Sequence, residues 1–277
     1  ASIVGARPQF IKAAPLSRRL RQEHSEILIH TGQHYDANLS QVFFDELQLP
    51  SPDYNLGVGS SQHGAQTGRM LEAVEAVLLQ EKPDWVIVYG DTNSTLAGAL
   101  AAAKLHIPVA HVEAGLRSKN RQMPEEINRI LTDHISDLLF CPSEQAAANL
   151  GAEGIIAGVY NIGDIMADSL RFLNQQCQEL PTICSTLGLS SKDYLLVTVH
   201  RAENTQYPER LSAIFLAINQ LNEPVILPLH PRTRLALEQQ GIKLKAHIYP
   251  IEPLGYCTMI ALEKHARVIL TDSGGMQ

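Results

Sequence analysis

The sequence predicts an α/β fold made of two Rossmann-like lobes facing a central cleft, and two patterns in the 277 residues support this. First, short runs rich in Val, Ile and Leu alternate with segments of helical spacing, which favours buried parallel strands joined by right-handed crossovers. Second, the alternation pauses between residues 142 and 193, where a Gly-containing region and a polar segment follow each other. We therefore place the domains at 1–165 and 166–277.

The apolar runs predict nine strands. These are Ser2–Val4, Ile27–His30, Trp85–Tyr89, Val109–Val112 and Asp137–Cys141 in the first lobe, and Tyr194–Val199, Val225–Leu229, His247–Ile251 and Ala266–Thr271 in the second. Two amphipathic helices are expected from the apolar faces Leu211, Ile214, Phe215, Ile218, Leu221 and Ile127, Ile130, Leu131, Ile135, and a further helix at Gln145–Leu150. About four strands are few for a self-sufficient second sheet. We therefore expect the second lobe to be truncated here, with more sheet and helix beyond Gln277.

Composition and charge narrow the class of protein. The chain has 22 Lys and Arg against 29 Asp and Glu, a net charge of −7, which argues against a nucleic-acid-binding surface and against a basic patch for anionic lipids. No stretch approaches 18 continuous apolar residues, so no membrane span is expected, and the first residues do not resemble a signal peptide. The four scattered cysteines form no CxxC, so we predict no disulfide, no thiolate metal site and a cytoplasmic location.

Polar residues recur where the predicted strands end. Ligands of open parallel sheets bind outside the carboxyl ends of the strands. Seven strand ends carry such residues here, among them Asp91 and Glu113 in the first lobe and His200, His230 and Asp272 in the second. This repetition predicts two rims of one ligand-binding cleft.

Two segments are candidate anion sites. We expect Pro15 to open a helix, which leaves residues 5–14 as an irregular loop that carries Arg7 and Lys12. Two cations above a helix N-terminus suit a phosphate or pyrophosphate, although solvated surface cations explain these residues equally well. In the second lobe, the backbone N–H groups of Ser273, Gly274 and Gly275 could face an anion, and a plain strand–helix turn is the alternative.

Three carboxylates are candidates for acid–base chemistry. Asp91 and Glu113 follow buried strands, and Glu125 lies in the first turn of a helix that begins at Pro124. Acids from separate segments can serve as general acid and base when their environments differ. The structural alternatives are a helix cap at Asp91, a role that Thr92 could also fill, and an exposed pair between Glu125 and Arg129.

Histidines offer a smaller set of candidates. His200 follows the first strand of the second lobe, where its ring could donate to a phosphate or ribose or transfer a proton, and His230 has a similar position. His30 and His34 are separated by Gly32, which argues against a metal site. No GxSxG elbow occurs, so covalent catalysis is not expected.

Six motifs occur together and in order: GARPQFIK (5–12), GDT (90–92), HVEAGLR (111–117), PEEINR (124–129), HR (200–201) and TDSGG (271–275). Together they resemble the non-hydrolysing UDP-N-acetylglucosamine 2-epimerases, over nearly the whole chain. The resemblance implies a glycosyltransferase-B-type fold with the nucleotide sugar between the lobes. It also implies interconversion of UDP-N-acetylglucosamine and UDP-N-acetylmannosamine by elimination and readdition of UDP, without a redox cofactor or metal.

The resemblance also assigns residues. Asp91, Glu113, Glu125 and His200 match the family's catalytic positions. The expected substrate and UDP contacts are Arg7, Lys12, Arg129, His230, Ser273, Gly274 and Gly275. The family is usually dimeric, so we expect a homodimer that binds a UDP-sugar.

Some positions depart from the family pattern and leave the sugar open. Gln9-Phe10 stands where many members carry a Glu-containing pair, and the segment between Arg117 and Glu125 is distinctive. Relatives that act on UDP-2,3-diacetamido uronic acids look similar in these places. A glycosyltransferase of the same architecture, a hydrolysing epimerase and a nucleotide-sugar sensor are the remaining alternatives.

Overall fold

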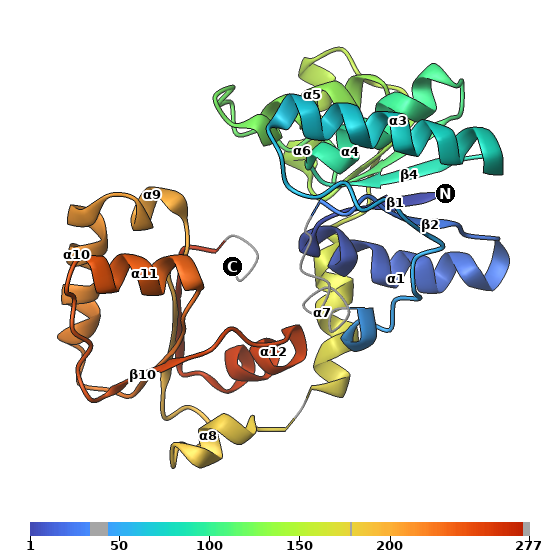
Figure 1. Cartoon of the computed structure of the whole chain (residues 1–277). Coiled ribbons are helices and arrows are strands. Elements are labelled where there is room, and N and C mark those ends of the chain that lie inside the picture. Colours follow the sequence, from blue (N-terminus) through green and yellow to red (C-terminus); the bar gives the residue numbers. More distant parts are fainter. Residues whose placement is uncertain (34–43, 178, 274–277) are drawn as a thin grey trace. The chain divides into compact units, whose positions relative to one another are not determined.

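A computed structural model describes residues 1–33, 44–177 and 179–273 (Figure 1). The chain divides into two compact units, Ala1–Phe172 and Leu173–Gln277. The division falls inside helix α7 (Ile165–Gln176), whereas the sequence placed the boundary near the first residue of that helix. Because α7 continues across the boundary between Phe172 and Leu173, the sequence there keeps its helical pattern and does not mark where one unit ends.

The first unit contains a seven-stranded parallel sheet in the order β3-β2-β1-β4-β5-β6-β7. Its strands are β1 (Ser2–Val4), β2 (Leu28–His30), β3 (Tyr54–Asn55), β4 (Val86–Tyr89), β5 (Val109–Val112), β6 (Leu138–Cys141) and β7 (Val159–Asn161). The five strands expected for this lobe are confirmed. The sequence missed β3 and β7 because both lie at the sheet edges, where two or three residues with polar or exposed side chains make no apolar run.

Helices cover both faces of this sheet. They are α1 (Arg7–Glu23), α3 (His63–Glu81), α4 (Asn93–Lys104), α5 (Pro124–His134), α6 (Glu144–Ala152) and the first part of α7. Figure 1 shows α3, α4 and α5 over one face and α1 on the other. The core between the sheet and the first of these faces includes Ile3 and Val88 from the strands and Val74 and Ala99 from α3 and α4. Because helices cover both faces of the sheet, both sets of side chains on a central strand are buried, so these strands appear in the sequence as continuous apolar runs.

Helix α1 corrects one expectation. It begins at Arg7, so the prediction that Pro15 opens the helix and that residues 5–14 form a loop is wrong. The N-cap, Ala6, has no polar side chain, but Gln9 Oε1 accepts hydrogen bonds from the backbone N–H groups of Gly5 (2.8 Å) and Ala6 (3.0 Å). These bonds satisfy donors that a helix N-terminus leaves unpaired, so the helix begins a full two turns before Pro15.

Pro15 is therefore an interior residue of α1. The backbone hydrogen bond that it removes is replaced by a side chain of another helix. A proline has no N–H, so the carbonyl of Ile11, four residues earlier, loses its partner in the helix. The buried hydroxyl of Ser169, on α7, donates to this carbonyl over 2.5 Å. A side chain 158 positions away thus makes an interior proline acceptable.

Helix α5 carries a second correction. Of the predicted apolar face, Ile127 and Leu131 point outward and are 46% and 47% exposed, Ile130 is half-buried, and Ile135, the C-cap residue, packs against the core. The buried residues of α5 are the polar Glu126, Asn128, Thr132 and Asp133. Apolar spacing predicted the helix correctly and its orientation wrongly, because these polar side chains have partners inside the unit.

The second unit contains a four-stranded parallel sheet in the order β10-β9-β8-β11. Its strands are β8 (Leu195–Thr198), β9 (Val225–Pro228), β10 (Ile248–Ile251) and β11 (Val268–Thr271), and its helices are the remainder of α7, α8 (Thr182–Thr186), α9 (Ala202–Thr205), α10 (Pro208–Asn219), α11 (Pro231–Gln239) and α12 (Tyr256–His265). All four expected strands are confirmed. The predicted apolar face of α10 is confirmed too, since Leu211, Phe215 and Ile218 pack into the core.

The prediction of no disulfide is wrong. Cys177, which follows α7, and Cys257, on α12, are joined by a disulfide, with their Cα atoms 5.6 Å apart. The two cysteines are separated by 80 residues, so their proximity arises from the packing of α12 and could not be found from spacing. Cys141 and Cys184 are free and buried. Within the described part of the chain, no helix is long and apolar enough to cross a membrane.

The Pro15–Ser169 relation can be tested by a double-mutant cycle. Ser169→Ala leaves the Ile11 carbonyl buried without a donor and is expected to lower the free energy of unfolding by about 1–3 kcal/mol. Pro15→Ala restores a backbone N–H for this carbonyl, so in that background Ser169→Ala should cost at least about 1 kcal/mol less. Urea unfolding of the four proteins measures both values. Equal costs in the two backgrounds would contradict the account.

Candidate active site

The carboxyl ends of β1, β4 and β5 are adjacent in the sheet, and they bring three functional segments together. The N-terminus of α1 follows β1, Gly90 and Asp91 follow β4, and Glu113 follows β5. The backbone N–H of Gly90 donates to the Val112 carbonyl over 2.9 Å, which joins the second and third of these segments. The predicted candidates of the first lobe thus share one edge of one sheet.

Lys12 and Glu113 form an ion pair at this edge. Lys12 lies in the second turn of α1 and is only 8% exposed, so its charge needs a partner. Gly90 leaves room for the ammonium group, because a Cβ at this position would lie 3.1 Å from Lys12 Nζ. Glu113 itself has φ +72°, a left-handed conformation that is uncommon outside glycine and is typical of functional sites.

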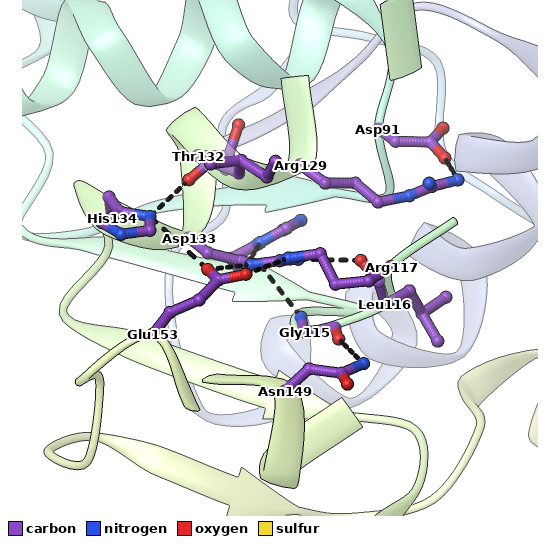
Figure 2. Close-up of polar contacts among 12 residues, drawn as sticks. Asp91, Gly115, Leu116, Arg117, Arg129, Thr132, Asp133, His134, Asn149 and Glu153 are labelled. Atoms are coloured by element: carbon purple, nitrogen blue, oxygen red, sulfur yellow. Dashed lines mark hydrogen bonds and ion pairs between the residues drawn. The ribbon is translucent and has the colours of Figure 1, made fainter. Parts of the chain in front are cut away.

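Asp91 pairs with Arg129 of α5 (Figure 2). The distance between Asp91 Oδ2 and Arg129 Nη2 is 2.5 Å. The alternative that Asp91 caps α4 is not observed, since Thr92 is the N-cap residue and its side chain accepts from Thr95 N. Asn128 Nδ2 donates to the Asp91 carbonyl over 3.0 Å, which fixes the backbone and leaves the carboxylate to Arg129.

Glu126 holds the other side of the same guanidinium. Glu126 Oε2 accepts from Arg129 Nη1 over 2.9 Å and from the backbone N–H of Ser118 over 2.8 Å, while Oε1 accepts from Lys119 N over 2.8 Å. Burial alone would raise the pKa of this carboxyl, but the hydrogen bonds from Ser118, Lys119 and Arg129 outweigh it and hold the pKa below its ordinary value. Glu126 is therefore a fixed anion.

Glu125 is in a different environment from its neighbour. It is exposed, and Arg129 pairs with Asp91 and Glu126, so the exposed pair between Glu125 and Arg129 is not formed. At 3.6 residues per turn, Glu125 lies on the same face of α5 as Asn128, Arg129 and Thr132. Its side chain therefore extends from the face that contacts Asp91, one turn closer to the N-terminus of the helix.

A buried network supports these strand ends (Figure 2). Asp133 Oδ1 lies 2.7 Å from His111 Nδ1, and Asp133 Oδ2 accepts from Gly115 N (3.1 Å) and Arg117 Nη1 (2.7 Å). His111 Nε2 lies 2.7 Å from the carbonyl oxygen of Gly90. A carbonyl only accepts, so Nε2 carries a proton. One carboxylate therefore links the end of β4, through His111, to the loop after β5.

The charge of Asp133 is stabilised by this network. Burial raises the pKa of Asp133, but the hydrogen bonds and charges of His111 and Arg117 dominate and hold it below its ordinary value. Arg117 is shared with Glu153 through two hydrogen bonds of 2.7 Å. Asp133 and Glu126 are site residues that were not expected from the sequence. One feature of the sequence could have identified them. Glu126 and Asp133 are spaced seven residues apart, on the side of the helix opposite Ile127 and Leu131, which is typical of a helix that buries a polar face.

Arg7 and Lys12, the two predicted anion-binding cations, differ in environment. Arg7 is the first residue of α1 and is half-buried, whereas Lys12 is buried further along the helix against Glu113. The loop that was expected to carry both does not exist, because residues from Arg7 onward are helical. Lys12 thus neutralises a candidate catalytic carboxylate.

In the second unit, Asp272 organises the end of the sheet. Its carboxylate accepts from the backbone N–H groups of His200 (3.1 Å) and Arg201 (3.0 Å) and from Asn204 Nδ2 (3.0 Å). Burial raises the pKa of Asp272, and the bonds from Asn204, Arg201 and His200 overcome this and lower it. β8 and β11 are neighbours, so the anion fixes the turn that presents His200, whose side chain is 43% exposed.

The other predicted residues of this unit lie at the same sheet edge. His230 is the N-cap of α11, and its Nδ1 accepts from Arg232 N over 3.2 Å. Ser273 follows β11, and its backbone N–H donates to Thr271 Oγ1 over 2.9 Å. Gly274 and Gly275 lie outside the described residues. Among those that are described, no group of three His, Cys, Asp or Glu side chains could hold a metal ion.

Comparison with known proteins shows the family of this chain. A family model described as UDP-N-acetylglucosamine 2-epimerase matches residues 18–277. The chain belongs to the UDP-N-acetylglucosamine 2-epimerase family. The solved structure of the Methanocaldococcus jannaschii UDP-GlcNAc 2-epimerase, in complex with UDP-GlcNAc and UDP, is 46% identical with a TM-score of 0.88, covering 99% of this chain and 79% of that chain. The predicted α/β fold of glycosyltransferase-B type and the non-hydrolysing epimerase family are confirmed.

Two curated relatives of this epimerase-family chain are also similar. A UDP-N-acetylglucosamine 2-epimerase homolog of Methanococcus maripaludis is 56% identical over 100% of this chain and 79% of the relative. The UDP-2,3-diacetamido-2,3-dideoxy-D-glucuronate 2-epimerase of Pseudomonas aeruginosa is 53% identical over 100% of this chain and 78% of the relative. The family is thus established, and relatives named for two different sugars resemble the chain.

The buried network makes a prediction about stability. Asp133→Asn replaces one acceptor oxygen by an amide and removes the charge that faces His111 and Arg117. We expect a loss of about 3–5 kcal/mol in the free energy of unfolding, the range for breaking a buried ion pair from one side. Asp168→Asn, which disrupts an exposed pair with Arg171, is the control and should change it by less than about 0.5 kcal/mol. Similar values for both variants would show that Asp133 does not stabilise the unit.

Proposed function

We propose that this protein interconverts UDP-N-acetylglucosamine and UDP-N-acetylmannosamine by epimerisation at C2, with elimination and readdition of UDP. The observation that carries the proposal is the grouping of Asp91 and Glu113 at adjacent strand ends, each with a cationic partner; the partner of Asp91, Arg129, lies one helical turn from Glu125 on α5. Membership of the epimerase family supports the same reaction.

The chemistry follows from the groups available. A carboxylate removes the C2 proton, the electrons of the C2–H bond form the C1=C2 double bond, and UDP leaves C1 with the electrons of the C1–O bond. UDP then adds back to C1, and a carboxylic acid returns a proton to the opposite face of C2. A carbon acid of low acidity requires a well-placed base, and two acids in different environments provide one for each face. The oxidation state of the sugar is unchanged, so no redox cofactor is required.

The remaining predicted residues are proposed to bind the nucleotide. Cationic and N–H donors stabilise the charge that grows on a departing diphosphate. We assign this role to Arg7, Arg129, His200, His230 and Ser273, together with Lys12, Gly274 and Gly275. Lys12 also contacts the candidate catalytic residues directly, through its ion pair with Glu113.

A second sugar is a specific alternative. The 53% identity to a UDP-2,3-diacetamido-2,3-dideoxy-D-glucuronate 2-epimerase exceeds the 47% identity to a UDP-N-acetylglucosamine 2-epimerase of Methanococcus maripaludis. Gln9 and the segment from Ser118 to Met123, where the sequence departs from the family pattern, adjoin the site: Gln9 bonds the Tyr89 carbonyl, and Ser118 bonds Glu126. The elimination at C2 is the same for both substrates.

The test is epimerisation in heavy water, with each UDP-sugar supplied separately and C2 followed by NMR. The proposal expects deuterium at C2 with UDP still attached. Asp91→Asn should lower turnover by about 10²- to 10⁴-fold, the usual contribution of an acid–base group. Asp84→Asn, at the opposite end of β4, is the control and should leave turnover unchanged.

Other outcomes identify the alternatives. Release of free sugar and UDP indicates a hydrolysing enzyme. A protonated C2 with both sugars indicates a glycosyltransferase or a nucleotide-sugar sensor. Deuterium only in the uronic acid derivative assigns the second sugar and rejects the first.

We also propose that the protein is a homodimer with α5 at the interface. Met123, Ile127 and Leu131 are spaced four residues apart and are 38–47% exposed, so they form an apolar stripe on the outer face of the helix. Such a stripe is self-complementary when two copies pack about a two-fold axis. The charged side chains that usually occupy an outer face are turned inward here.

The interface predicts a change in mass. The wild-type protein should have twice the mass of its chain by size exclusion with light scattering, and Ile127→Glu combined with Leu131→Glu should halve it, because two buried charges per copy face each other. Leu216→Glu, at an exposed apolar residue of α10 in the second unit, is the control and should stay dimeric. A monomeric wild type, or a dimeric α5 variant, would rule this interface out.

A further inference from the structure

The two adjacent glutamates of α5 have opposite environments. Glu125 is exposed, whereas Glu126 is 1% exposed. The Glu126 carboxylate accepts four hydrogen bonds: from Ser118 N (2.8 Å), Ser118 Oγ (2.9 Å), Lys119 N (2.8 Å) and Arg129 Nη1 (2.9 Å). Oε2 accepts three of these bonds and Oε1 accepts one, so both oxygens are held by protein donors. Because the carboxylate is also buried, Glu126 is poorly placed to take a proton from a substrate.

Arg129 is held between two carboxylates. One nitrogen, Nη1, donates to Glu126, and the other, Nη2, donates to Asp91 over 2.5 Å. The guanidinium is planar and rigid, so a bond that fixes one of its nitrogens also fixes the direction of the other. The position of the Asp91 carboxylate thus depends on a contact that Asp91 does not make itself.

Glu126 also connects α5 to the segment before it. Its carboxylate accepts hydrogen bonds from the backbone N–H groups of Ser118 and Lys119. Lys119 has a left-handed backbone conformation, with φ +59°. A non-glycine residue in this region persists only where its surroundings hold it. The carboxylate thus closes this segment onto the N-terminal turn of α5 while it holds Arg129.

We propose that Glu126 is a positioning residue of the epimerase: it orients Arg129, and through Arg129 it aims the Asp91 carboxylate at C2 of the sugar. This rests on the function proposed above, because it gives Asp91 an acid–base role. Glu126 itself contacts no substrate. The two glutamates of the PEEINR motif thereby have separate tasks, one exposed on the face toward Asp91 and the other buried behind it.

Glu126→Gln places an amide among four donors, so Arg129 and the segment at Ser118 lose part of their anchor. We expect kcat for C2 epimerisation to fall about 10- to 100-fold, because a misplacement near 1 Å has effects of this size. KM and the dissociation constant of UDP should change much less than kcat, because Arg129 is one of several residues assigned to the nucleotide and the others do not contact Glu126. Glu126→Asp retains the charge and should recover part of kcat. Glu81→Gln, which alters a glutamate bonded to Tyr54 at the end of α3, controls for general destabilisation and should leave kcat unchanged.

A cycle with Arg129 separates positioning from a structural role. Arg129→Lys retains the charge but cannot hold two carboxylates in one plane. Since Glu126 acts through Arg129, adding Glu126→Gln to Arg129→Lys should lower kcat by no more than about threefold further. Single-variant losses that multiply in the double variant would overturn the proposal, as would a wild-type kcat in Glu126→Gln.

A crystal structure of Glu126→Gln provides a readout that is independent of turnover. It should show the guanidinium of Arg129 displaced from Asp91. An unchanged contact between these two side chains would refute the positioning role even if the wild-type protein epimerised neither sugar. An inactive wild type with a displaced Arg129 would instead refute the proposed function and retain the Glu126–Arg129–Asp91 linkage.

Discussion

The first unit depends on a buried carboxylate, that of Asp133. It accepts hydrogen bonds from Gly115 and Arg117, and it faces His111, which reaches the carbonyl of Gly90. An isolated buried charge would destabilise the fold by several kcal/mol or lose its ionisation, so every one of these partners is needed. The consequence is that the turns after β4 and β5 share one rigid support. Asp91 and Glu113 are presented from these turns.

This support explains the unusual orientation of α5. The helix directs Glu126, Asn128 and Asp133 inward, where each has partners, and it leaves Ile127 and Leu131 at the surface. Ordinary amphipathic packing would bury the apolar face at a gain of about 1.5–3 kcal/mol per side chain. Here the polar network decides the orientation instead, because a polar side chain without its buried partner would cost a comparable amount. One helix thereby forms part of the site and exposes an apolar surface.

The second unit uses the same device with different residues. Asp272 follows β11 and accepts from the backbone N–H groups of His200 and Arg201, which follow the neighbouring strand β8. In both units burial raises the pKa of an aspartate, and donors from an adjacent segment outweigh burial and hold that pKa below its ordinary value. Each sheet thus has a fixed anion at its carboxyl edge. The candidate residues project from loops that this anion keeps in one conformation, which favours preorganised chemistry.

The sequence alone determined the strands and helices that are predicted by a pattern of neighbouring residues. Continuous apolar runs predicted nine of the described strands, helical spacing predicted α10, and the position of Asp91 and Glu113 after successive strands predicted that they share an edge. The tertiary structure decided what depends on distant partners. The hydrogen bond from Ser169 to the Ile11 carbonyl allows Pro15 inside α1. The partners of Asp133 decide which face of α5 is buried. The packing of α12 places Cys257 beside Cys177. In each case the deciding contact joins residues separated by tens of positions, so it leaves no periodic trace in the chain.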